Sequence, residues 1–271
     1  PRSIVLFLAG SLPGEAILHM RQLSLLSMIC HLPDDPLHQH AKYTLSTLPP
    51  SSLSWFHQVR DLCLQYNLPH PLVLLDQPVP KYKFKKLVKL RVTEHWQQVL
   101  STECSSPSLT SLQYFDPHKA SLLHPHPLWT SSAGNSFECS KSTVLARMVS
   151  GRYRTEALCR FWSSNRSGHC LSDTCHNVKG DLLHLLIVCP ALEHTRHRLH
   201  SLWCSKSADC PPLHSLVLRI LGSSPESQVR FILDSTANPE LVKLIQMFGQ
   251  EIQDRVLYLT RTWAFAINRQ K

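Results

Sequence analysis

GHCLSDTCHNVKGDLLHLLIVCPAL, residues 168–192, is the stretch of this sequence that best predicts both a local fold and a chemistry. It contains four side chains that bind soft or borderline metal ions, in the order Cys170, Cys175, His184 and Cys189, with gaps of four, eight and four residues. Zn²⁺ prefers four such ligands in a tetrahedron, and sets of three cysteines and one histidine are typical of closed structural sites. The spacing therefore predicts one structural Zn²⁺ and a small knuckle folded around it.

A turn is expected between the first two cysteines, because Ser172 and Asp173 are common turn formers. Two other histidines, His169 and His176, lie directly beside these cysteines, and either is an alternative ligand. A simpler interpretation also stays open. The chain has ten cysteines and seventeen histidines, and ordinary reduced cysteines in such a chain can match a ligand spacing by chance.

A short helix is expected to carry the last two ligands. Asp181 is a good N-cap for a helix over residues 182–188. In a continuous α-helix, His184 and Cys189 would point about 140° apart, because they are separated by five residues at 3.6 residues per turn. Pro190 pushes the residue before it out of the helical region, so the helix is expected to stop near Cys189 and let its sulfur turn back.

Three segments around this site carry a resemblance to a known family. They are SGRYRTEALCRFW at residues 150–162, SNRSGHC at residues 164–170 and DLLHLLIVCPALEHTR at residues 181–196. Together they resemble the region that follows the polymerase in reverse transcriptases of non-long-terminal-repeat (LINE-type) retrotransposons, where the family carries a Cys-Cys-His-Cys zinc motif. The specific match covers residues 145–199, and two segments, 12–33 and 125–129, are similar more loosely.

The resemblance implies a nucleic-acid-gripping accessory tail for target-primed reverse transcription. It implies that the polymerase and the endonuclease lie upstream, so that this chain, which begins at Pro1, is expected to be a fragment and not an enzyme. RNA or single-stranded DNA and the upstream polymerase domain are the implied partners. The chain departs from the family in the first ligand gap, which has four residues where two or three are more usual.

Composition agrees with a polyanionic partner. The chain has 28 Lys and Arg against 19 Asp and Glu, a net charge of +9 and a pI of about 9.2. No run approaches the roughly 18 apolar residues that cross a bilayer, so no membrane contact is expected. The cysteines lack the dense pattern of a small disulfide scaffold and are expected to be reduced, in a nuclear or cytoplasmic, intracellular protein.

Two basic groups predict where nucleic acid binds. The first is a helix over residues 81–100 with a polar side rich in lysine, and the second begins at residue 147 and interleaves arginines with aromatic residues. Single strands stack their bases on aromatic rings and pair their phosphates with cations. The alternative is a solvated lysine face and an aromatic core. The predicted contacts are Lys85, Lys86 and Lys89 in the first group and Arg147, Arg152, Tyr153, Arg154, Arg160, Trp162 and Arg166 in the second.

The remaining pattern predicts a mainly α fold, an irregular multi-helix domain with a small Cys₃His knuckle and long loops rich in Pro, Ser and His. Residues 68–80, with four prolines, are expected to be an extended connector. Ser142 is expected to cap a helix, and an apolar stripe over residues 241–263 predicts one long helix that begins after Asn238. The expected organisation is a helical region at 1–100, a linker at 101–139, a knuckle region at 140–204 and a helical region at 205–271.

Catalytic motifs are missing from the sequence. It has no Gly-rich phosphate loop and no recognisable nucleophile motif. The adjacent acidic pair Asp34 and Asp35 lies between two prolines, which favours a loop over a metal-binding polymerase pair. Four protein ligands also leave no open position for a catalytic water.

Two rival interpretations remain beside nucleic-acid binding. One is a zinc-stabilised helical module that binds a protein through its C-terminal helix. The other is a decayed retroelement fragment without activity. Binding to single-stranded RNA or DNA distinguishes the nucleic-acid-binding interpretation from both rivals.

Overall fold

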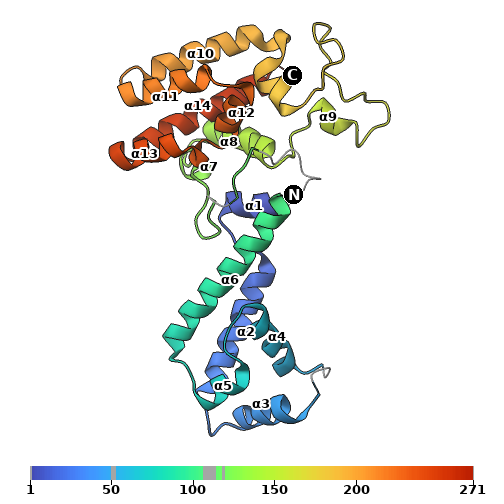
Figure 1. Ribbon diagram of the computed structural model, residues 1–271, viewed down its shortest axis with the longest axis vertical. Helices are drawn as coiled ribbons and strands as arrows, with labels where there is room; N and C mark the ends of the chain where they lie inside the picture. Colours follow the sequence, from blue (N-terminus) through green and yellow to red (C-terminus); the bar gives the residue numbers. More distant parts are fainter. Residues whose placement is uncertain (1, 50–52, 106–113, 118–119, 271) are drawn as a thin grey trace. The chain divides into compact units, whose positions relative to one another are not determined.

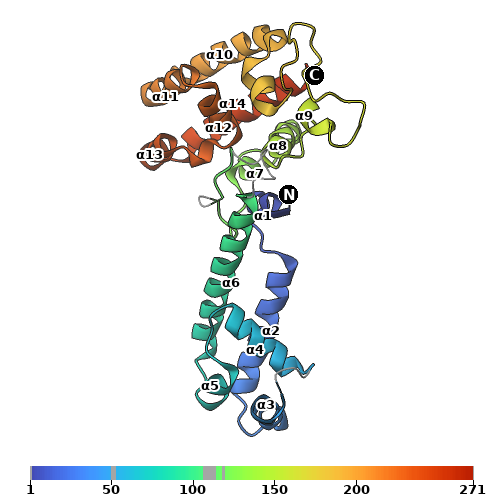
Figure 2. The ribbon, with the colours of Figure 1, turned by 45° about the vertical axis from the view of Figure 1, so that its right-hand side comes forward.

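The computed structural model describes residues 2–49, 53–105, 114–117 and 120–270, and it divides into two compact units (Figures 1 and 2). One unit is Ser11–Thr102, and the other combines Pro1–Gly10 with Glu103–Lys271. Within the described ranges the regular elements are helices, and the only paired extended residues are His169 and Lys179. The predicted mainly α fold with a Cys₃His cluster is confirmed.

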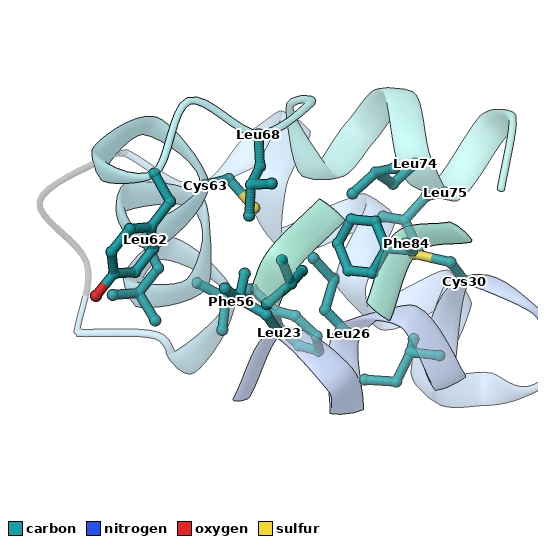
Figure 3. Close-up of a cluster of buried hydrophobic side chains, with 14 of the residues drawn as sticks. Leu23, Leu26, Cys30, Phe56, Leu62, Cys63, Leu68, Leu74, Leu75 and Phe84 are labelled. Carbon is teal, nitrogen blue, oxygen red and sulfur yellow. The ribbon is translucent and has the colours of Figure 1, made fainter. Parts of the chain in front are cut away.

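The unit Ser11–Thr102 is built from helices around one apolar core. Figure 3 shows Leu23 and Leu26 of the first of these helices among Phe56, Leu74 and Phe84 from later ones, and all of these side chains are buried. The helices are α2 (Gly14–Cys30), α3 (Pro36–Thr47), α4 (Trp55–Gln65), α5 (Pro71–Asp76) and α6 (Lys81–Cys104), of which the last two residues belong to the other unit.

Two expectations for this unit have different outcomes. Asp34 and Asp35 lie in the turn before α3, as the loop prediction expected, and the Asp35 side chain caps the helix by accepting a hydrogen bond of 2.8 Å from the Leu37 amide. The extended connector predicted for residues 68–80 is wrong in its middle, where α5 forms. Pro71 occupies the first turn of α5, a position that needs no amide donor, and His70 caps it.

The second unit is arranged around α14 (Gln250–Asn268), which buries Val256, Leu259, Trp263 and Ile267. Trp263 packs edge-on against Trp203 of α10, with ring centroids 5.2 Å apart. The other helices of the unit are α1 (Arg2–Ala9), α7 (Pro127–Thr130), α8 (Ser136–Val149), α9 (Glu156–Cys159), α10 (Glu193–Ser207), α11 (Pro211–Leu221), α12 (Pro225–Leu233) and α13 (Pro239–Phe248). In Figure 1, α10, α12 and α13 lie beside α14, and α11 lies beside α10 and α13.

Helix α8 begins earlier than the sequence indicated. Asn135 is its N-cap, because the side chain accepts hydrogen bonds from the Phe137 and Glu138 amides at 3.1 Å. Ser142, the expected cap, lies in the helix interior and donates a hydrogen bond of 3.1 Å to the Leu128 carbonyl. The part of the predicted 101–139 linker that the structure describes therefore contains helical segments.

The described residues include no single helix that is both long and apolar enough to cross a membrane. Ser3–Ala9 and Gly14–Cys30 meet the criteria of length and composition only as a pair, with a break between them. Both helices bury large apolar side chains, among them Phe7 in the first and Leu23 in the second.

The predicted single C-terminal helix is wrong, because Gly249 divides it into α13 and α14. Its backbone has φ 85° and ψ −173°, a combination that is essentially restricted to glycine. The apolar stripe continues across the break, with Leu241 and Leu244 buried before it and Ile252 and Val256 after it. The hydrophobic spacing therefore located the buried faces but not the bend.

Replacing Gly249 by Ala is expected to destabilise the protein by about 1–3 kcal/mol, since an L-residue is strained at this φ and ψ. The measurement is urea unfolding of the full chain. Gly14→Ala is the control, because Gly14 is helical and a Cβ there has no atom within 4 Å. Equal unfolding midpoints for the two variants would contradict the assigned strain.

Candidate metal centre

The four predicted ligands converge on one point. One ligand atom from each of Cys170, Cys175, His184 and Cys189 lies within 4.8 Å of the others. The sulfur of Cys189 is 3.9 Å from that of Cys170 and 3.6 Å from that of Cys175. In a tetrahedral site with Zn–S bonds of about 2.3 Å, neighbouring sulfurs are about 3.8 Å apart. The cluster can therefore hold one metal ion with little rearrangement.

The first half of the knuckle is a loop of chain that backbone hydrogen bonds close. The Cys170 amide donates to the Val178 carbonyl at 2.8 Å, and the Gly180 amide donates to the Gly168 carbonyl at 3.0 Å. Between these contacts the Cys175 amide donates to the Ser172 carbonyl at 2.9 Å, which forms the turn predicted from Ser172 and Asp173.

The second half differs from the predicted α-helix. Asp181 does act as a cap, since its side chain accepts a hydrogen bond of 3.0 Å from the His184 amide. Residues His184–Val188 then form a π-helix, and the Cys189 amide donates to the His184 carbonyl five residues back at 2.7 Å. Helical structure stops at Cys189, which has ψ 117° before Pro190, as predicted. The wider turn brings the sulfur back beside the imidazole.

His184 has the properties of a metal ligand. Its side chain is buried, and among the described residues neither ring nitrogen has a hydrogen-bond partner. Burial lowers the pKa of His184 from its ordinary value, which favours the neutral ring that binds metals. A buried polar ring without partners is unfavourable, and a bound ion would satisfy one nitrogen. His169 and His176, the alternative ligands, are outside the cluster.

The cysteine thiols differ in acidity. Burial raises the pKa of Cys189 to about 12. Burial also acts to raise the pKa of Cys175, but hydrogen bonds from Thr174 and from the neighbouring thiols outweigh it and lower the pKa. Metal binding requires all three thiolates, so it would release protons from this cluster.

A buried cation lies directly behind the cluster. Arg196 of α10 donates a hydrogen bond of 2.6 Å from Nη2 to the Cys189 carbonyl, while its Nη1 has no partner in the described part of the chain. The Glu193 carboxylate attracts Arg196, but no described carboxylate forms an ion pair with it. Three thiolates and a neutral imidazole around a divalent ion carry a net charge of −1. Arg196 is therefore placed to balance the charge of a filled site.

The first predicted basic group lies on α6. Phe84, Val88 and Val92 are buried there, and Lys85, Lys86 and Lys89 are exposed. The Lys86 ammonium lies 4.5 Å from the centre of the Tyr82 ring. The amphipathic helix was thus located correctly, and its function as a binding face stays a prediction.

The second predicted group is mostly on the surface. Arg147, Arg152, Arg154, Arg160, Trp162 and Arg166 are all exposed. Arg166 forms two hydrogen bonds, of 2.9 and 2.8 Å, to the buried Glu156. Tyr153 lies in the interior instead, where its hydroxyl donates to Asn268 at 3.1 Å. Its ring is packed and is not presented for base stacking.

Two surface residues near the knuckle were absent from the predicted contacts. Phe161, two residues after the end of α9, is 72% exposed, and Lys179 is also on the surface. Both line a groove of about 330 Å³ beside the knuckle. Phe161 carried a usable signal, its place between Arg160 and Trp162, whereas Lys179 is an ordinary loop lysine in the sequence.

Comparison of the chain with protein-family models, with curated proteins and with solved structures finds no match. The metal centre and the surface around it are therefore interpreted from their own residues.

Replacing Cys175 by Ser is expected to lower metal affinity strongly, because the ion loses one of three thiolates. The check is metal content by mass spectrometry after the protein is loaded and passed over a desalting column. Cys204→Ser is the control, since Cys204 is half-buried and outside the cluster. We expect about one ion per chain in the wild type and the control. Equal metal content in both variants would exclude this site.

Replacing Arg196 by Met is expected to weaken metal binding by about 10- to 100-fold, the range for groups that support the ligands from outside. A chelator competition measures the affinity. Arg198→Met removes an exposed cation from the same helix and should change it little. If both variants bind metal with the affinity of the wild type, Arg196 does not balance the charge of the metal site.

Proposed function

We propose that this chain is a zinc-binding, nucleic-acid-binding accessory segment of a LINE-type retrotransposon reverse transcriptase, without a polymerase or endonuclease site of its own. The observation that carries the proposal is the convergence of Cys170, Cys175, His184 and Cys189 beside an exposed group of arginines and aromatic rings. The segments that resemble the family include these same residues. The proposed setting is a nuclear or cytoplasmic complex with the upstream polymerase.

Zinc is the ion that best suits the cluster. Three sulfurs and one imidazole form a soft to borderline set, and the sulfur separations agree with a tetrahedron. Four protein ligands complete that geometry, which favours a structural over a catalytic role. In this proposal the ion folds the knuckle and positions its neighbours.

The neighbouring surface supports a single-stranded partner. Arg152 and Arg154 are exposed on either side of the buried Tyr153, so the packed tyrosine anchors the segment between them. Phe161 and Trp162 are exposed beyond α9. Exposed cations next to exposed aromatic rings suit RNA or single-stranded DNA, whose bases are available to stack.

A protein-binding module is the second candidate. It is favoured by exposed apolar side chains at the end of α13, where Met247 is 66% and Phe248 52% exposed. Such residues are common at interfaces between proteins. Under this candidate the chain binds zinc but has no affinity for nucleic acid.

Replacing Arg152, Arg154 and Arg160 together by Ala is expected to weaken binding to single strands. The salt slope should fall by about 0.7 for each phosphate that the variant no longer neutralises. The measurement is titration with single-stranded RNA and DNA at several salt concentrations.

The matched control is a triple Ala variant of Arg198, Lys206 and Lys243, which removes the same charge from exposed positions elsewhere in the unit. Equal losses of affinity in the two variants would show that the strand is held only by nonspecific electrostatic attraction. An absence of binding by the wild type would favour the protein-binding module or a decayed fragment.

A further inference from the structure

A groove of about 330 Å³ lies beside the knuckle, between the segment that carries α9 (Figure 1) and the chain leading to His184. One wall includes Leu158, Arg160 and Phe161. The other includes Lys179 and Leu182, and the buried Tyr153 also lines the groove. Its size is at the lower end of the range of about 300–1,000 Å³ for small-ligand pockets.

The two walls are held together by packing and hydrogen bonds. The Ala157 amide of α9 donates to the Gly180 carbonyl of the knuckle at 3.1 Å. Gly180 permits this approach, because a Cβ there would lie 2.9 Å from the Glu156 Cβ. Arg166 pairs with Glu156 from outside. The groove is thus formed before any ligand is bound, which reduces the ordering that binding requires.

The groove combines apolar surface with positive charge. Lys179 forms an ion pair of 3.4 Å with Asp181, whose other oxygen accepts the His184 amide. Arg160 has no described carboxylate partner, and its guanidinium lies 5.1 Å from the centre of the Phe161 ring. The three charged side chains together leave a net charge of +1 beside an exposed aromatic ring.

We propose that this groove binds one unpaired nucleotide of a single strand, with its base against Phe161 and its phosphate at Arg160 and Lys179. This inference rests on the proposed function and assigns it a specific contact. A flat aromatic base with an attached anion matches both properties of the groove. A duplex keeps its base faces stacked on one another, so the groove discriminates in favour of unpaired strands.

The test uses the full zinc-loaded chain and short single-stranded RNA and DNA. Phe161→Ala should weaken binding by about 5- to 150-fold, the range for loss of one base stack. Phe248→Ala is the matched control, because Phe248 is an exposed phenylalanine outside the groove. Lys179→Ala should lower the salt slope by about 0.7, and Lys243→Ala is its control.

A strand with one abasic position, moved along its length, isolates the contact between base and ring. The wild type should lose affinity when the abasic position reaches the groove. The Phe161→Ala variant should bind the abasic strand and the intact strand with equal affinity, because it has no ring for the base to stack on. This double-mutant cycle separates stacking from any general effect of the substitution.

The outcomes distinguish the groove from the wider function. If the wild type binds single strands, the arginine triple variant binds them weakly, and Phe161→Ala and Lys179→Ala match their controls, the groove assignment falls and the proposed function stands. If the wild type binds no single strand, both fall. Binding of an acidic peptide to the groove without any binding of strands would assign it to a protein partner and overturn the proposal.

Discussion

The convergence of three sulfurs and one imidazole is the constraint on which the knuckle depends. In the described part of the chain the buried His184 ring has no hydrogen-bond partner, and Arg196 is buried with its Nη1 unpaired. Both features are unfavourable in a low-dielectric interior. One divalent ion would relieve both, because it would bind the imidazole and, together with the three thiolates, would give Arg196 an anionic neighbour. Few residues of the knuckle are buried enough to replace that contribution.

The ligand residues are also tied to surfaces beyond the cluster. Cys189 is linked to α10 through Arg196, and Leu186 is linked to α14 by a hydrogen bond of 3.3 Å from the Trp263 indole. On the other side, Gly180 holds α9 beside the knuckle. A small site of four side chains therefore fixes both its attachment to the helical core and the walls of the adjacent groove.

The sequence predicted correctly those parts of the site that depend on residues close together in the chain. The ligand spacing, the turn at Ser172 and the stop before Pro190 all depend on residue types a few positions apart. The features that the sequence did not predict depend on packing between residues far apart in the chain. In the sequence Tyr153 looks like a stacking platform beside two arginines, but in the structure it is buried and its hydroxyl donates to Asn268, far along the chain. Gly249 interrupts a continuous apolar stripe, and the spacing alone carries no sign of the bend.

The π-helix at His184–Val188 fixes the number of residues that can separate the last two ligands. Each residue of an α-helix turns the chain by about 100°. Deleting one residue between His184 and Cys189 would let a regular α-helix form, and it would shift the final sulfur around the helix by about that angle. The loop before the helix can absorb an insertion or a deletion far more readily. Length variation in this knuckle should therefore be confined to its first half, between Cys170 and Asp181.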